Sequence, residues 1–192
     1  MNKVLILTDN VSAPLNAPRM RNLYNNLCAN NYDWQPFLIT DFVEKSQIST
    51  LFVNAENVHQ LELSPSRNVI IWFFQFVTNL LFKTTEKKML QKALQISKVQ
   101  HFDLILCSIS NIFPMYAAAK LSKKLNLPLI FDFRDINEQW AQQEFTTHSF
   151  NFLGLEKLAN KLYGKLIISQ RNHLISNAIH IITISQWHTD FF

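Results

Sequence analysis

The sequence predicts an α/β domain with a doubly wound, mostly parallel sheet. Short apolar runs alternate with longer amphipathic stretches along the whole chain, which is the pattern of strands joined by crossover helices. One complete unit lies within residues 103–135: an apolar run at Asp103–Cys107, a helix over Ile112–Asn126 and a second apolar run at Leu129–Phe133. Two apolar strands joined by a helix form the right-handed repeating unit of a parallel sheet.

The remaining elements follow in the same alternation. The predicted strands are apolar runs bounded by polar residues, in chain order Lys3–Thr8, Trp34–Thr40, Val58–Leu63, Asp103–Cys107, Leu129–Phe133 and Ile179–Ile184. The predicted helices carry apolar residues three and four positions apart, in chain order Arg19–Asn30, Arg67–Phe82, Thr85–Gln100, Ile112–Asn126 and Leu153–Ser176. Asn111 is placed to cap the helix over 112–126, and Pro114 stands in its first turn, where a missing N–H costs little.

Composition indicates one globular domain, residues 1–192, with no linker or repeat. Apolar residues make up 48% and charged residues 17% of the chain, as in ordinary globular proteins. The net charge of +4 is mild, and basic residues do not interleave with aromatic ones, so we expect no nucleic-acid partner. The two cysteines suggest neither a disulfide framework nor a zinc site, and the N-terminal apolar run is too short for a signal peptide. These observations favour the cytoplasm.

Glycine is nearly absent, with only Gly154 and Gly164 in the chain. A dinucleotide-binding domain or a phosphate-binding P-loop needs glycines in the first strand–helix turn, and the loop Asp9–Pro18 has none. The six histidines are dispersed without ligand spacing, so we expect no metal site. No Gly-x-Ser-x-Gly motif supports a serine hydrolase. We expect no tightly bound cofactor.

Three segments resemble the N-terminal domain of family 4 glycosyltransferases, which have the two-domain GT-B architecture with Rossmann-like domains. The chain has the strand–helix–strand segment with a Leu127-Pro128 step and an Asp-x-Arg-Asp ending at Asp132–Asp135. Its start, KVLILTDNVSAPLNAPRMRNLYNNL, is similar to the family's first strand, acceptor-facing loop and first helix. Its end, SNAIHIITISQW, is similar to the family's Ala-Asp-x-Ile-Ile-x-x-Ser strand. The segments occur in the family's order and spacing.

The resemblance implies transfer of a sugar from a nucleotide-sugar co-substrate to a hydroxyl of a polysaccharide or lipid-linked acceptor. In that family a C-terminal domain with a spaced pair of glutamates holds the donor, and no such pair occurs here. We therefore expect this chain to be the acceptor-side domain, inactive alone, which works with a donor domain in cis or in trans. It is either a fragment or a natural single-domain protein. The alternative is a non-catalytic α/β binding or scaffold domain.

Ligands in parallel sheets bind beyond the carboxyl ends of the strands, so polar residues there are the candidate substrate-binding residues. They are Asp9, Asn10, Arg19, Ser108, Ser110, Asn111, Arg134, Asp135 and Ser185. The structural alternatives are that Arg134 and Asp132 pair with neighbouring groups, that Asn111 only caps a helix, and that Arg19 only covers the start of the first helix. Where many family members have a histidine, this chain has Ser108–Asn111, so no catalytic base is assigned.

The stretch Val69–Phe82 has an unusual composition, because only Gln75, Thr78 and Asn79 are polar. It is shorter than the ~20 residues that cross a bilayer. One interpretation is a helix buried between the sheet and a neighbouring element. The other is a helix in the membrane interface at the inner face, with Trp72, Phe73 and Phe76 on lipid and the lysines after it on anionic headgroups. Lipid-linked acceptors, which the family resemblance implies, favour the second interpretation.

Overall fold

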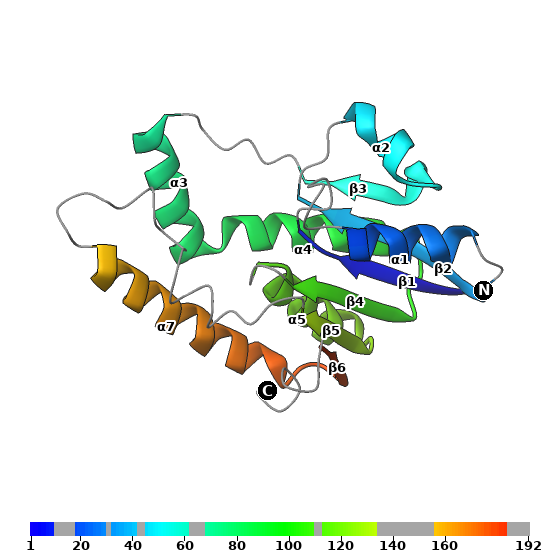
Figure 1. Cartoon of the computed structure of the whole chain (residues 1–192). Coiled ribbons are helices and arrows are strands. Elements are labelled where there is room, and N and C mark those ends of the chain that lie inside the picture. The colour runs from blue at the N-terminus through cyan, green and yellow to red at the C-terminus, as the bar shows by residue number, and fades with distance from the viewer. Residues whose placement is uncertain are drawn as a thin grey trace.

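A six-stranded sheet in the order β3-β2-β1-β4-β5-β6 forms the centre of the protein (Figure 1). The computed structural model describes residues 1–9, 18–29, 32–41, 45–61, 68–109, 113–133 and 156–183. The strands are β1 (Asn2–Leu7), β2 (Trp34–Thr40), β3 (Val58–Gln60), β4 (Leu104–Ile109), β5 (Leu129–Phe133) and β6 (His180–Ile182). Every pairing between them is parallel. The strand order reverses between β1 and β4, which is where ligands bind in doubly wound sheets.

The described helices are α1 (Pro18–Ala29), α2 (Lys45–Leu51), the 3₁₀ turn η1 (Ala55–Asn57), α3 (Val69–Phe82), α4 (Thr84–Ser97), α5 (Phe113–Leu125) and α7 (Glu156–Ile175). The predicted fold class is therefore confirmed, and each predicted strand and helix is present with bounds shifted by a few residues. The sequence analysis missed α2 and η1. Their segments are short, and α2 has apolar residues only at Ile48 and Leu51, too few to mark a helical face.

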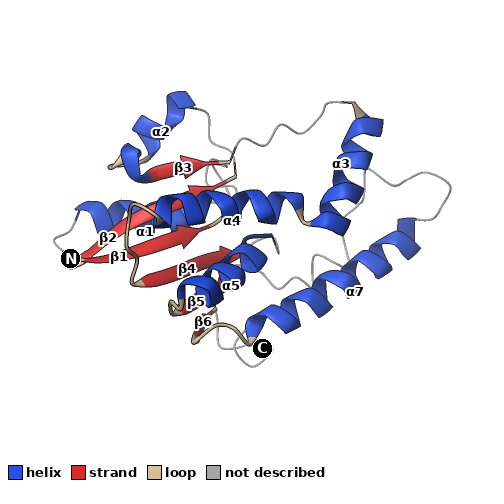
Figure 2. Cartoon of the chain, turned by 180° about the vertical axis from the view of Figure 1, so that it is seen from behind, coloured by secondary structure: helices blue, strands red, loops and turns tan. Residues whose placement is uncertain are grey.

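Odd- and even-numbered strand residues face opposite sides of the sheet, because side chains alternate along a strand. The odd positions, such as Leu5 and Phe131, pack with helices α4 and α5. The even positions, such as Ile6 and Leu38, pack with α1, mainly against Met20 and Tyr24. Helix α1 lies in front of the sheet in Figure 1, and α4 and α5 lie in front of it in Figure 2, which is the view from behind. Both faces of the parallel sheet are thus covered, as such sheets require.

A fixed corner joins α3 to α4. Lys83 takes the left-handed conformation, φ 52° and ψ 49°, which ends one helix and allows the next to begin at once. The Asn79 side-chain oxygen accepts hydrogen bonds from the Thr84 hydroxyl and the Thr85 N–H, both at 2.8 Å. The Lys83 ammonium donates to Gln170 on α7 at 3.0 Å and lies 4.8 Å from the ring centre of Tyr116 on α5. These contacts set the angle at which α3 leaves the body of the domain.

Within the described part of the chain, no helix is both long enough and apolar enough to cross a membrane. The side chains of Trp72, Phe73 and Phe76, the predicted lipid contacts, are outside the described residues, although the backbone of α3 is described.

Candidate functional site

Four buried polar residues lie side by side at the carboxyl end of the sheet, on the face covered by α1. They are Thr40 on β2, Thr8 after β1, Ser108 on β4 and Asp132 on β5, and each is almost fully buried. Ser108 pairs with Asp132 in the register of β4 and β5, and Thr8 directly follows the last paired residues of β1 with β2 and with β4. All four have even numbers, so they continue the apolar face of their strands with polar groups. We call them the polar row.

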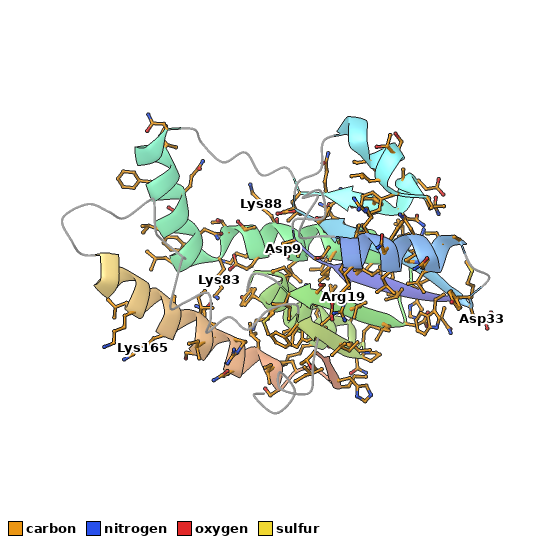
Figure 3. All side chains as sticks on the ribbon, in the orientation of Figure 1. Asp9, Arg19, Asp33, Lys83, Lys88 and Lys165 are labelled. Carbon is orange, nitrogen blue, oxygen red and sulfur yellow. The ribbon has the colours of Figure 1, made fainter. Side chains whose placement is uncertain are left out.

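Arg19 contacts the polar row at its β5 end, where it pairs with Asp132. Its Nη2 lies 2.8 Å from Oδ1 of Asp132, and the Ser108 hydroxyl donates to Oδ2 of the same carboxylate at 3.2 Å. Asp132 is only 1% exposed, whereas the Arg19 side chain is 42% exposed. The first turn of α1 therefore places a guanidinium that is anchored on its buried side and open to solvent on the other (Figure 3).

This arrangement suits recognition of an anion or a hydroxyl. A guanidinium has five N–H donors in a rigid fork, so the contact with Asp132 leaves other donors facing solvent. A buried carboxylate partner keeps the arginine oriented before any ligand arrives, which reduces the ordering cost of binding. The N-terminus of α1 adds a favourable dipole for negative charge at the same place.

The structure brings three of the predicted site residues to this end of the sheet: Asp9, Arg19 and Ser108. Asp9 directly follows β1 and is fully buried, and its backbone oxygen accepts a hydrogen bond from the Thr8 hydroxyl at 3.2 Å. Figure 3 labels Asp9 and Arg19. The other predicted site residues lie outside the described part of the chain, namely Asn10, Ser110, Asn111, Arg134, Asp135 and Ser185.

The sequence analysis did not name Asp132 as a site residue, considered only that it pairs with a neighbouring group, and did not consider Thr8 or Thr40. In the structure Asp132 pairs with Arg19, which comes from the opposite end of the sequence. One sequence signal could have indicated the polar row. Along each central strand the residues that face α1 are apolar, and the last residue on that face is polar instead. Arg19 lies in the first turn of α1 and pairs with Asp132, and its contact with substrate stays a prediction.

A second polar cluster lies at the same end of the sheet on its other face, around the start of α4. Glu86 is buried in the first turn of α4, and burial raises the pKa of its carboxyl group, while the charges of Lys83 and Lys87 act in the opposite direction. Both Lys83 and Lys120 lie near the ring of Tyr116, at 4.8 and 5.7 Å from its centre. Lys83 thereby joins the start of α4 to α5, and its hydrogen bond to Gln170 joins it to α7.

Glu86 should contribute more to the stability of the folded protein at acidic than at neutral pH. Its ordinary pKa is 4.5 and its folded-state pKa is higher, so the folded protein binds this proton more tightly than the unfolded protein does. The stabilisation by that proton is complete below about pH 4.5 and is lost as the pH rises through the raised value. Glu86→Gln, which is never charged, should therefore unfold at higher urea concentration than the parent at pH 8, with the difference shrinking toward pH 4. An equal difference at both pH values would contradict this assignment.

The described residues were also considered for a metal site and for a cavity away from the polar row. No group of three or more metal-ligating side chains occurs among residues that the structure describes. A cavity of about 330 Å³ lies between the end of α5 and the turn before β6, lined by residues that include Ser122, Asn126 and Asn177. It opens at the amino ends of the strands, opposite the polar row.

The all-parallel sheet and its strand order define a Rossmann-like α/β domain, and this domain matches solved structures of the GT-B type in fold. No protein-family model and no curated protein sequence matches the chain.

One similar structure is described as a UDP-N-acetylglucosamine 2-epimerase from Listeria monocytogenes, with a TM-score of 0.54 and 7% identity over 99% of this chain and 42% of that one. Another is apo UGT2 from Phytolacca americana, with a TM-score of 0.54 and 8% identity over 95% of this chain and 45% of that one. UGT2 with UDP-2-fluoro-glucose and pterostilbene gives a TM-score of 0.50 and 10% identity over 95% and 48%. The likeness is one of fold, and the chain spans less than half of each of these proteins.

Proposed function

We propose that the chain is the acceptor-side domain of a glycosyltransferase that moves a sugar from a nucleotide-sugar donor to a hydroxyl. The observation that carries the proposal is the pair of Arg19 and Asp132 at the switch point of the sheet. A solvent-facing guanidinium anchored on a buried carboxylate supplies oriented donors where substrates of such sheets bind. The fold shared with nucleotide-sugar enzymes supports this choice of chemistry.

In this proposal each residue has a limited role. Arg19 holds a hydroxyl or a phosphate oxygen of the acceptor, and Asp132 and Ser108 position Arg19. Further proposed substrate contacts are Asp9, Asn10, Ser110, Asn111, Arg134, Asp135 and Ser185. A donor domain, in cis or in trans, would bind the nucleotide-sugar and meet the charge of the leaving phosphate with cations and helix N-termini. The catalytic base is not among the residues assigned.

The acceptor is proposed by chemistry only, as a saccharide of a growing polysaccharide or of a lipid-linked intermediate. Membership of family 4 and a location in the cytoplasm at the inner face of a membrane belong to the same proposal. The alternative is a non-catalytic binding or scaffold domain. The two differ in one respect: a scaffold domain needs no saccharide site at Arg19.

We predict that the 192-residue chain binds nucleotide-sugars weakly and acceptor-like glycosides measurably. Calorimetric titration with a panel of UDP- and GDP-sugars should give no micromolar affinity, because the donor site belongs to the other domain. Titration with simple alkyl glycosides, followed by NMR, should shift the arginine side-chain N–H signal that disappears in Arg19→Lys. Micromolar nucleotide-sugar binding by this chain would overturn the acceptor-side assignment. Absence of any glycoside effect at Arg19 would favour the scaffold alternative.

A further inference from the structure

The positive charge of Arg19 is compensated inside the domain. Its Nη2 lies 2.8 Å from Oδ1 of Asp132, and the Ser108 hydroxyl donates a hydrogen bond to the other carboxylate oxygen at 3.2 Å. A guanidinium and a carboxylate at that distance form a pair without net charge. Because the Asp132 side chain is only 1% exposed, salt screens its charge much less than it screens a carboxylate on the surface.

The pair therefore offers hydrogen-bond donors with little net positive charge. A guanidinium has five N–H donors in a rigid fork, and the 42% exposure of the Arg19 side chain leaves part of that fork open to solvent. An anion that binds there is attracted by the guanidinium and repelled by the carboxylate behind it. The two forces partly cancel, because the Coulomb energy falls only as the inverse of the distance. A neutral hydroxyl oxygen is not subject to this repulsion and still accepts a directed hydrogen bond.

The surroundings of the pair add little attraction for an anion. The dipole of α1 favours negative charge at its N-terminus, but the helix begins with Pro18, which has no N–H to donate. The residues that follow β1 and β2 at this edge of the sheet include Asp9 and Asp41, and both are acidic. Apart from Asp132, the polar row consists of uncharged hydroxyl side chains. These surroundings favour a neutral ligand over a phosphorylated one.

We infer that Arg19 binds a neutral hydroxyl of the acceptor saccharide and that Asp132, through Arg19, makes the site select uncharged over phosphorylated acceptors. The inference rests on the proposed function and narrows its substrate class, because that function alone allows either a hydroxyl or a phosphate oxygen at Arg19. Asp132 is a positioning residue in this account. It is too buried to contact a ligand, and it acts by orienting Arg19 and compensating its charge.

Titration of the 192-residue chain with matched neutral and phosphorylated ligands tests the inference. The probes are methyl glycosides of glucose, galactose, mannose and N-acetylglucosamine, each paired with the phosphate monoester of the same sugar. The NMR signal of the arginine side-chain N–H that is absent in Arg19→Lys reports the contact. In the parent chain a neutral glycoside should shift this signal. Its phosphate ester should bind no more tightly, and its affinity should change little between low and physiological salt.

Asp132→Asn should reverse this preference. The amide oxygen can still accept a hydrogen bond from Arg19 but carries no charge, so the phosphate ester should bind about tenfold more tightly than it binds the parent. That affinity should fall as salt is added, while the affinity for the neutral glycoside should change by less than about threefold. The control is Asp33→Asn, which removes the same charge from an exposed residue before β2, at the amino end of the sheet (Figure 3), and should alter neither affinity.

The possible results separate this inference from the proposed function. A phosphate ester that binds the parent chain about tenfold more tightly than the neutral glycoside would overturn the inference and leave the proposed function standing. So would an unchanged preference in Asp132→Asn that urea unfolding shows to be folded. No shift of the Arg19 signal with any neutral or phosphorylated probe would overturn both. The comparison in the parent chain decides the inference even if Asp132→Asn does not fold.

Discussion

Replacing Arg19 by alanine should lower the free energy of unfolding by about 3 kcal/mol, more than replacing its partner Asp132, which should cost about 1–2 kcal/mol. The asymmetry follows from burial. The Asp132 carboxylate is 1% exposed and would remain in the sheet without its arginine, whereas Arg19 is 42% exposed and can turn to water when Asp132 is removed. Urea unfolding of the single variants and of the double variant measures all three values.

The double variant tests the pairing itself. If Arg19 mainly neutralises Asp132, the double variant should be no less stable than Arg19→Ala alone, which gives a coupling energy on the order of 2 kcal/mol. Arg21→Ala, the same change two positions further along α1, serves as the control and should cost less than about 0.5 kcal/mol. Additive effects of Arg19→Ala and Asp132→Ala would mean that the ion pair contributes little and that the solvent-facing guanidinium is not anchored by it.

Arg134→Ala should lower kcat/KM by ten- to a hundredfold in a complete enzyme that contains this domain. Arg134 directly follows β5 in the sequence and is two residues after Asp132. The carboxyl end of β5 is where we propose that substrate binds. A charged hydrogen bond to an acceptor or phosphate oxygen contributes roughly 1.5–3 kcal/mol, which corresponds to that range. Arg134→Lys should restore little if the contact is bidentate. Initial rates at varied acceptor concentration measure the effect.

Thermal unfolding of the same variants distinguishes this role from a structural one. The Tm of Arg134→Ala should stay close to that of the parent. A fall of several degrees, together with an unchanged specific activity of the folded fraction, would identify Arg134 as a structural ion-pair partner, which was the alternative considered from the sequence.

The fold was predictable because local patterns and the tertiary structure agree. The runs Trp34–Thr40 and Leu129–Phe133 are strands with the predicted bounds, since both are buried on two faces and need no alternation to be visible. Helix α2 escaped prediction because its position depends on contacts made after folding, such as the Asn25 side chain, which donates to the Leu51 carbonyl. A helix of that length has too few residues to show a helical periodicity of apolar side chains.

The site was predictable only in part, because it is assembled from segments far apart in sequence. The carboxyl ends of the strands could be named in advance, and Asp9, Arg19 and Ser108 followed from that rule. The partner of Asp132 could not be predicted, because Arg19 is far from it in the sequence. The two residues are close only because β1, β4 and β5 are neighbours in the sheet. Ile71, Phe74, Leu81 and Phe82 on α3 are exposed in the structure, whereas the composition of that helix was also compatible with burial.

The polar row has a consequence for the natural variation of this protein. Its four members share one face only because each strand keeps the same parity, and a gain or loss of one residue inside a strand reverses every side chain beyond that point. Such a change in β5 would bury Arg19's carboxylate partner among the apolar side chains under α5 and turn a phenylalanine toward α1. Insertions and deletions among natural variants should therefore fall between the strands. The strands themselves should change by substitution and keep their length.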